Sequence, residues 1–162
     1  MLNWSHFAAQ DEQAEDERTR RLRFDIPLLA RRVSGAIDWL RQRADTRHLS
    51  IWCFGASTGA AAALVASAEH AGVVGAVVSR GGRPDLAGPA LPRVAAPTLL
   101  IVGGNDIPVI AINEAAAGQL RVEHRIEIVP GATHLFEEPG AIATVAELSR
   151  AWFSRHLSTA GA

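Results

Sequence analysis

Two kinds of hydrophobic pattern alternate along the chain. Short runs dominated by hydrophobic, β-branched or aromatic residues are typical of buried strands, and four are present: residues 50–54, 73–79, 98–102 and 125–129. The run at 73–79 is almost unbroken, as expected for a strand covered on both faces. Segments with hydrophobic residues at helical spacing separate or flank these runs. They predict helices at about 27–44, 60–68, 109–120 and 141–157.

Strands that alternate with helices predict a parallel sheet with right-handed crossover connections. The expected fold class is therefore α/β, with a parallel sheet of about four strands flanked by helices. Asp25 is placed to cap the first helix, just before Pro27. No internal repeat and no second domain is evident, so we expect a domain at 25–158, an N-terminal arm at 1–24 and a tail at 159–162.

The N-terminal arm has a different character from the rest of the chain. A dense acidic block at 11–17 is followed at once by four arginines within 18–23. Such a segment is typical of a solvated helix or of a partly disordered arm. Trp4 and Phe7, which precede the block, could anchor the arm to an apolar surface.

Composition and charge narrow the classes of function. The chain has 162 residues, 48% of them hydrophobic, and a formal net charge of −1. This balance predicts a globular protein without a basic surface for nucleic acid or anionic membranes. The single cysteine, Cys53, excludes an intramolecular disulfide and indicates a small core residue. We find no apolar run long enough for a signal peptide or membrane span, so a cytoplasmic location is expected.

The most informative motif is Gly55-Ala56-Ser57-Thr58-Gly59, which has the form G-x-S-x-G. It lies between the predicted strand at 50–54 and an alanine-rich helix, and strand, sharp turn and helix are the context of a nucleophile elbow. In such an elbow the glycines let backbone segments pass closely and the serine hydroxyl stands above the sheet. The alternatives are an ordinary strand–helix turn and a serine that only caps its helix.

Two further polar residues are expected at the same edge of the sheet. Parallel strands place chemistry at their carboxyl ends, and Asp106 and His134 follow the third and fourth predicted strands. Their order after Ser57 is the order that this type of elbow requires. His134 would take the proton of Ser57, and Asp106 would orient the imidazole. The backbone N–H of Thr58 would be one donor of the oxyanion hole.

Each of these assignments has an alternative. Asp106 lies in a Gly-Gly-Asn-Asp sequence that favours a turn, and Asp85, after the second strand, is a rival for the acid. His134 could be a loop residue or could cap the last helix. Arg80 and Arg83 could bind an anionic group of a substrate, although loop arginines at a surface are common.

These residues resemble the α/β-hydrolase superfamily and, within it, the dienelactone-hydrolase-like group. The resemblance extends over about 24–157 and is strongest in one bacterial branch, through the segments 24–29, 54–59, 79–85 and 130–140. It implies an eight-stranded sheet and a triad of Ser57, Asp106 and His134. True dienelactone hydrolases use a cysteine nucleophile, so lactone specificity is not expected here. Some members of the branch are fused to a phosphoribosyltransferase domain, but no signature of that activity is visible.

The resemblance also predicts a shortfall at the N-terminus. In the family four strands precede the helix that leads into the elbow strand, whereas only 26 residues, ten of them charged, precede Pro27 here. We therefore expect the chain to be truncated relative to the family and to lack the loop that donates the second oxyanion N–H. Loss of one such donor typically costs roughly 10²- to 10³-fold in turnover.

The elbow strand would then lie at an edge of the sheet, with unpaired backbone groups. This predicts a homodimer through that edge, or pairing with a separate N-terminal half. The expected function is a serine hydrolase that acts on an ester or related acyl bond of a small molecule. Its turnover would be weak without the second oxyanion-hole donor. The alternative is a non-catalytic remnant that functions by pairing with itself or a partner chain. No cofactor or metal is expected, because no cluster of histidine, cysteine or carboxylate residues has ligand spacing.

Overall fold

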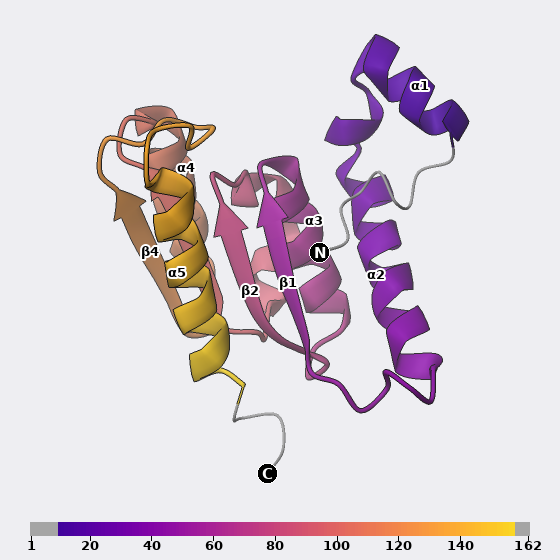
Figure 1. Cartoon of the computed structure of the whole chain (residues 1–162). Coiled ribbons are helices and arrows are strands. Elements are labelled where there is room, and N and C mark those ends of the chain that lie inside the picture. Colours follow the sequence, from indigo (N-terminus) through magenta and orange to yellow (C-terminus); the bar gives the residue numbers. More distant parts are fainter. Residues whose placement is uncertain (1–9, 158–162) are drawn as a thin grey trace.

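A four-stranded parallel sheet forms the centre of the molecule (Figure 1). The computed structural model describes residues 10–157. The strands lie side by side in the order of the sequence: β1 (Ile51–Ala56), β2 (Val74–Arg80), β3 (Thr98–Gly103) and β4 (His124–Val129). All three pairings are parallel. The predicted fold class is confirmed, and the carboxyl ends of all four strands meet at one edge.

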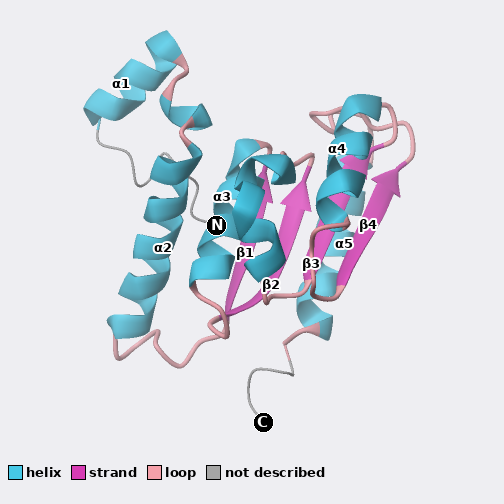
Figure 2. Ribbon diagram, turned by 180° about the vertical axis from the view of Figure 1, so that it is seen from behind, coloured by secondary structure: helices cyan, strands magenta, loops and turns pink. Residues whose placement is uncertain are grey.

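Helices cover the sheet on both faces, so the molecule has three layers (Figures 1 and 2). On one face α3 and α4 pack against the strands with α2 beside α3, and on the other face α5 packs against β2, β3 and β4. The helices are α1 (Gln10–Thr19), α2 (Ile26–Gln42), α3 (Thr58–Glu69), α4 (Ile107–Ala117) and α5 (Ala141–Arg155). Two 3₁₀ segments, η2 (Leu22–Phe24) and η3 (Pro84–Arg93), were not predicted.

The core consists of two hydrophobic clusters separated by the sheet. Side chains that alternate along β2 illustrate the division: Val77 faces the α3 side, and Val78 faces the α5 side. Both are fully buried. The unbroken hydrophobic run predicted for this strand is thus explained, because both faces of β2 are covered.

The start of α2 follows its sequence signals. The Asp25 carboxylate accepts a hydrogen bond of 2.9 Å from the backbone N–H of Leu28, and Pro27 occupies the first turn. This N-cap satisfies one of the backbone donors that a helix leaves unpaired at its start. The cap marks the point where α2 begins. From there α2 runs away from the carboxyl ends of the strands, toward the start of β1 (Figure 1).

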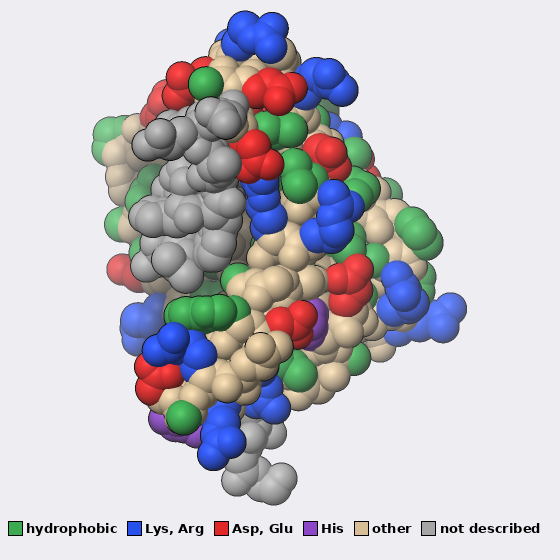
Figure 3. Space-filling view, turned by 90° about the vertical axis from the view of Figure 1, so that its right-hand side faces the viewer, with side chains coloured by type: hydrophobic (Ala, Val, Ile, Leu, Met, Phe, Trp, Pro, Cys, Tyr) green, Lys and Arg blue, Asp and Glu red, His purple; other side chains and the backbone are tan. Residues whose placement is uncertain are grey.

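The acidic block of the arm forms the helix α1, one of the two alternatives that the sequence allowed. Its Asp16 is buried and accepts hydrogen bonds from the backbone N–H of Arg23, at 2.9 Å, and from the guanidinium, at 2.7 Å. A second ion pair, between Glu12 and Arg32, ties α1 to α2. Acidic and basic side chains are interspersed on this side of the molecule (Figure 3). The predicted anchors Trp4 and Phe7 lie outside the described residues.

The strand β1 lies at an edge of the sheet, as the sequence predicted, but one of its side chains is more exposed than expected. The sequence indicated a buried strand, whereas the Phe54 side chain is 38% exposed. Phe54 lies on the α5 side of the sheet, where α5 packs on β2, β3 and β4 and leaves the face of β1 largely open. Trp52, on the same face, is partly covered by a stacked contact with Phe153, whose ring centre lies 5.7 Å away. β-Branched and aromatic residues indicate a strand but not how many of its sides are covered.

Candidate active site

Ser57 occupies a strained turn between β1 and α3. Its φ and ψ angles are 50° and −125°, outside the regions that non-glycine residues favour. Such strain is typical of functional positions and of the serine in a nucleophile elbow. Ser57 stands at the N-cap position of α3, but its side chain makes no capping hydrogen bond. The alternative that Ser57 serves only as a helix cap is therefore not supported.

The two glycines of the motif differ in their surroundings. A methyl group on Gly55 would lie 2.5 Å from the carbonyl oxygen of Gly59 and 2.6 Å from the backbone of Ala60. Within residues 10–157, no atom other than those of the chain neighbours and of the backbone of the same helical turn lies within 4 Å of the corresponding position on Gly59. The close passage of strand and helix that the motif predicts is thus present at Gly55 alone. It brings the first turn of α3 directly against the end of β1.

Asp106 and His134 come together at the carboxyl edge of the sheet, as strand order predicts. The His134 Nδ1 atom lies 2.7 Å from Asp106 Oδ2. The Asp106 side chain is 14% exposed and that of His134 is 41% exposed, so the pair reaches solvent through the imidazole. Asp106 stands at the N-cap position of α4 without capping it, and Gly140, not His134, precedes α5. His134 therefore lacks the capping role that the sequence left open, whereas Asp106 does close the predicted turn, since its backbone N–H donates to the Gly103 carbonyl at 3.0 Å.

The rival acid, Asp85, has a different partner. Its carboxylate accepts two hydrogen bonds from Arg83, at 2.9 Å and 2.8 Å. These bonds hold the pKa of the Asp85 carboxyl below its usual value. The prediction that Asp106 and not Asp85 contacts His134 is confirmed.

Several hydrogen bonds hold the loop that carries His134. The backbone N–H of Asn105 donates to the Ala132 carbonyl at 2.9 Å, and the Asn105 side chain donates to the Gly131 carbonyl at 2.8 Å. The Glu138 carboxylate accepts a hydrogen bond of 3.0 Å from the backbone N–H of Thr133. The chain after β3, which includes Asp106, is therefore fixed to the loop after β4.

The chain after β2 contacts the elbow itself. The Ser57 carbonyl accepts a hydrogen bond of 3.0 Å from the Arg83 N–H. The buried Asn113 of α4 holds the same turn, because its side-chain amide donates to the Gly82 carbonyl at 3.1 Å and to the Val109 carbonyl at 2.8 Å. The sequence pattern did not predict a role for Asn113. An asparagine on the buried side of a helix indicates that its side chain makes such a contact, but the sequence does not identify the partner.

Of the two arginines proposed for substrate binding, Arg83 is paired with Asp85 and Arg80 contacts the His134 loop. Their predicted contact with a substrate stays a prediction. Thr58 is the first residue of α3, so its N–H has no partner within the helix and remains available as a donor.

Cys53 lies within β1 and is buried, as predicted. Its burial raises the pKa of the thiol to about 11, so the thiol is protonated near neutral pH. Within residues 10–157, no group of three histidine, cysteine or carboxylate residues is arranged to hold a metal ion. Across the same part of the chain, none of the helices combines the length and apolar character needed to cross a bilayer.

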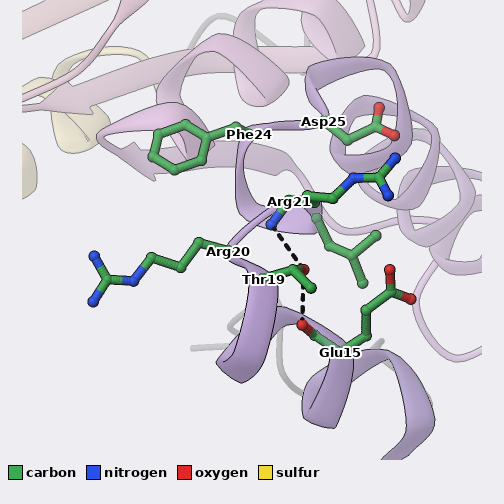
Figure 4. Close-up of a pocket in the computed structure, with 7 residues that line it drawn as sticks. Glu15, Thr19, Arg20, Arg21, Phe24 and Asp25 are labelled. Carbon is green, nitrogen blue, oxygen red and sulfur yellow. Dashed lines mark hydrogen bonds between the residues drawn. The ribbon is translucent and has the colours of Figure 1, made fainter.

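A cavity of about 460 Å³ lies in the arm, between α1, η2 and the start of α2 (Figure 4). Its lining includes Glu15, Thr19 and Arg21, which are linked through the Thr19 hydroxyl by hydrogen bonds of 2.8 Å and 3.3 Å. None of Ser57, Asp106 and His134 lines it. We therefore place the candidate site at the strand ends and not in this cavity.

The sequence and the fold are both similar to known proteins. A family model described as the dienelactone hydrolase family matches residues 6–159. Two curated proteins from Mycobacterium tuberculosis strains, which carry a provisional phosphoribosyl transferase name, are each 53% identical over 147 residues. That match covers 91% of this chain and 33% of each relative, so the chain spans about a third of their length.

Solved structures of dienelactone hydrolases and related proteins are also similar to this chain. The crystal structure of dienelactone hydrolase from Anabaena variabilis has 61% sequence identity and a TM-score of 0.90, over 93% of this chain and 69% of that one. A dienelactone hydrolase-like promiscuous phosphotriesterase from metagenomic libraries is 18% identical, with a TM-score of 0.69 over 88% of this chain and 67% of its own. The second likeness concerns the fold alone.

Proposed function

The chain belongs to the dienelactone hydrolase family, and on that premise we propose that it is a serine hydrolase of an ester or related acyl bond. Ser57 is the nucleophile, His134 the general base and Asp106 the residue that orients the imidazole. The observation that carries the proposal is the 2.7 Å contact between His134 Nδ1 and Asp106 Oδ2. It lies at the edge of the sheet where Ser57 is held in its strained turn.

The contact between Asp106 and His134 selects the tautomer of the imidazole. An ionised carboxylate only accepts hydrogen bonds, so the imidazole proton resides on Nδ1 and the Nε2 lone pair is left to act as base. His134 then removes the proton of the Ser57 hydroxyl while the Ser57 oxygen attacks the carbonyl carbon of the substrate. The same proton passes to the departing alkoxide, and a water molecule cleaves the acyl-enzyme by the reverse steps.

Charge that develops on the carbonyl oxygen is stabilised at the start of α3. The Thr58 N–H is the donor assigned there, and the helix dipole favours negative charge at the same point. The four described strands and their connections do not include the loop that provides a second donor in the family fold. We therefore expect slow turnover from this chain alone.

The alternative, a remnant that works by association and not by catalysis, makes a different prediction. A remnant has no need of a reactive serine, whereas a slow hydrolase retains one. Steady-state hydrolysis of p-nitrophenyl acetate and butyrate by the purified chain tests the proposal, with Ser57→Ala as the matched variant. We expect wild-type turnover above that of the variant. Equal rates for the two proteins would favour the remnant.

A second variant tests the role of Asp106. In Asp106→Asn the imidazole is expected to adopt the wrong tautomer, which costs roughly 10⁴-fold in a serine triad. Asp85→Asn, at the rival acid, is the control and should leave hydrolysis nearly unchanged because Asp85 contacts Arg83.

A further inference from the structure

The main chain of Arg80 contacts the nucleophile elbow. Arg80 is the last residue of β2 and lies opposite Ala56 in the parallel register of β1 and β2. Its carbonyl oxygen accepts a hydrogen bond of 3.3 Å from the Ser57 N–H. The backbone of Arg80 is therefore fixed relative to Ser57.

The side chain of the same residue contacts the histidine loop. Arg80 Nη1 donates a hydrogen bond of 3.3 Å to the carbonyl oxygen of His134, 54 positions away in the sequence. The guanidinium carbon lies 5.3 Å from the ring centre of Phe136, within the range of a cation–π contact. Phe136 is 1% exposed and has a left-handed backbone conformation with a φ of 58°. The guanidinium thus holds the loop on both sides of Leu135.

The charge of Arg80 has an unusual environment. Within residues 10–157, no carboxylate forms an ion pair with Arg80, whereas the nearby Arg83 is paired with Asp85. Burial lowers the pKa of the Arg80 guanidinium from its usual value, although an arginine stays charged near neutral pH. A half-buried cation needs compensating contacts. Here they come from the His134 carbonyl and the Phe136 ring.

Gly81 shows how closely the two segments approach. Its φ is +50°, and a methyl group there would lie 3.2 Å from the His134 carbonyl oxygen and 3.3 Å from the Phe136 ring. The chain after β2 therefore packs directly against the His134 loop. Because the Arg80 side chain contacts this loop directly, a change in that side chain acts directly on the position of His134.

We propose that Arg80 is a positioning residue, which joins Ser57 through its main chain to His134 through its guanidinium and so sets the distance between nucleophile and base. This inference rests on the proposed function for its catalytic consequence. It differs from the sequence-based expectation that Arg80 binds an anionic group of the substrate. A positioning residue acts on every substrate alike, whereas an anion-binding residue acts only on charged ones.

Two variants of Arg80 separate charge and donor from packing. Arg80→Met keeps a long apolar side chain against Phe136 but removes the hydrogen bond and the charge. Arg80→Lys keeps a charged donor and is expected to restore part of the function. The hydrogen bond to Ser57 is made by the Arg80 main chain, so we expect both variants to retain it.

The first measurement does not require activity. The His134 Nδ1 proton, held by Asp106, is followed by proton NMR and identified by its loss in His134→Ala. We expect its exchange with water to be about tenfold faster in Arg80→Met, because the loop loses a hydrogen bond from a charged donor. Arg80→Lys should show a smaller increase. Unchanged exchange in a folded Arg80→Met protein overturns the proposal, even when its melting temperature falls.

The second measurement compares the neutral ester p-nitrophenyl acetate with the anionic mono-p-nitrophenyl ester of succinate. We expect kcat to fall about tenfold for both in Arg80→Met, with KM nearly unchanged. A rise in KM confined to the succinate ester would overturn the positioning role in favour of substrate binding. If the wild-type chain hydrolyses neither ester, the proposed function fails, and the NMR exchange still decides whether Arg80 positions His134.

Discussion

The two glycines of the G-x-S-x-G motif are predicted to respond in opposite ways to the same substitution. In Gly55→Ala the new methyl group would lie 2.5–2.6 Å from backbone atoms of Gly59 and Ala60. Backbone atoms cannot rotate away as a flexible side chain does, so β1 and α3 must separate. Overpacking of this kind typically costs about 1–3 kcal/mol, and we expect a value near the upper end.

Gly59→Ala is the matched control. Gly59 is the second residue of α3, and among the described residues no atom outside this helical turn lies within 4 Å of its new methyl group. Replacing a helical glycine by alanine stabilises a helix by roughly 0.5–1 kcal/mol.

Thermal unfolding by calorimetry measures the difference between the two variants. For a chain of this size 1 kcal/mol corresponds to about 2–4 °C in Tm. Gly55→Ala should therefore melt about 6–12 °C below the wild type, and Gly59→Ala at or slightly above it. A Gly55→Ala protein with wild-type Tm, or an equal loss in both variants, would refute the close-contact argument.

Three further predictions concern pH, a buried amide and assembly. The chain contains neither lysine nor tyrosine, and the pKa of the Cys53 thiol is raised to about 11 from 9.0, so the native state holds this proton where the unfolded chain loses it. The free energy of unfolding, measured with urea, should therefore fall by about 2 kcal/mol between pH 9 and 11 in the wild type, and an equal fall in Cys53→Ala would contradict this. Asn113→Ala, which leaves the Gly82 carbonyl unpaired, should cost about 1–3 kcal/mol of unfolding free energy in the same assay; the exposed Gln119→Ala should cost little. In sedimentation velocity at micromolar concentration we expect a species larger than the monomer, and a compact, non-aggregating monomer would refute the predicted association.

Local patterns predicted the elements of the fold well. The four strands and the principal helices occur where hydrophobic periodicity places them, with ends shifted by a few residues. The cap at Asp25 needed only the sequence, because its partner Leu28 is three residues away. The neighbourhood of Asp106 and His134 also followed from the sequence, since adjacent parallel strands deliver their carboxyl ends to one edge.

Contacts between distant segments could not be predicted in the same way. The hydrogen bond from Arg80 to the His134 carbonyl joins residues 54 positions apart and depends on the conformation of two loops. The exposure of Phe54 depends on how far α5 extends across the sheet. The difference between Gly55 and Gly59 arises because the backbone of the first turn of α3 passes against Gly55. Each depends on tertiary packing and not on local propensity.

The central claim is that Ser57 is a nucleophile activated by His134, and covalent labelling tests it most directly. The purified chain is treated with a fluorophosphonate ester, and the adduct is located by intact mass and peptide mapping. We predict one adduct per chain on Ser57, none in Ser57→Ala and none in His134→Ala, because the hydroxyl then lacks its base. His124→Ala, at the opposite end of the strands, is the control and should label like the wild type. A folded wild-type chain that remains unlabelled, or a His134→Ala variant that labels normally, would contradict the claim.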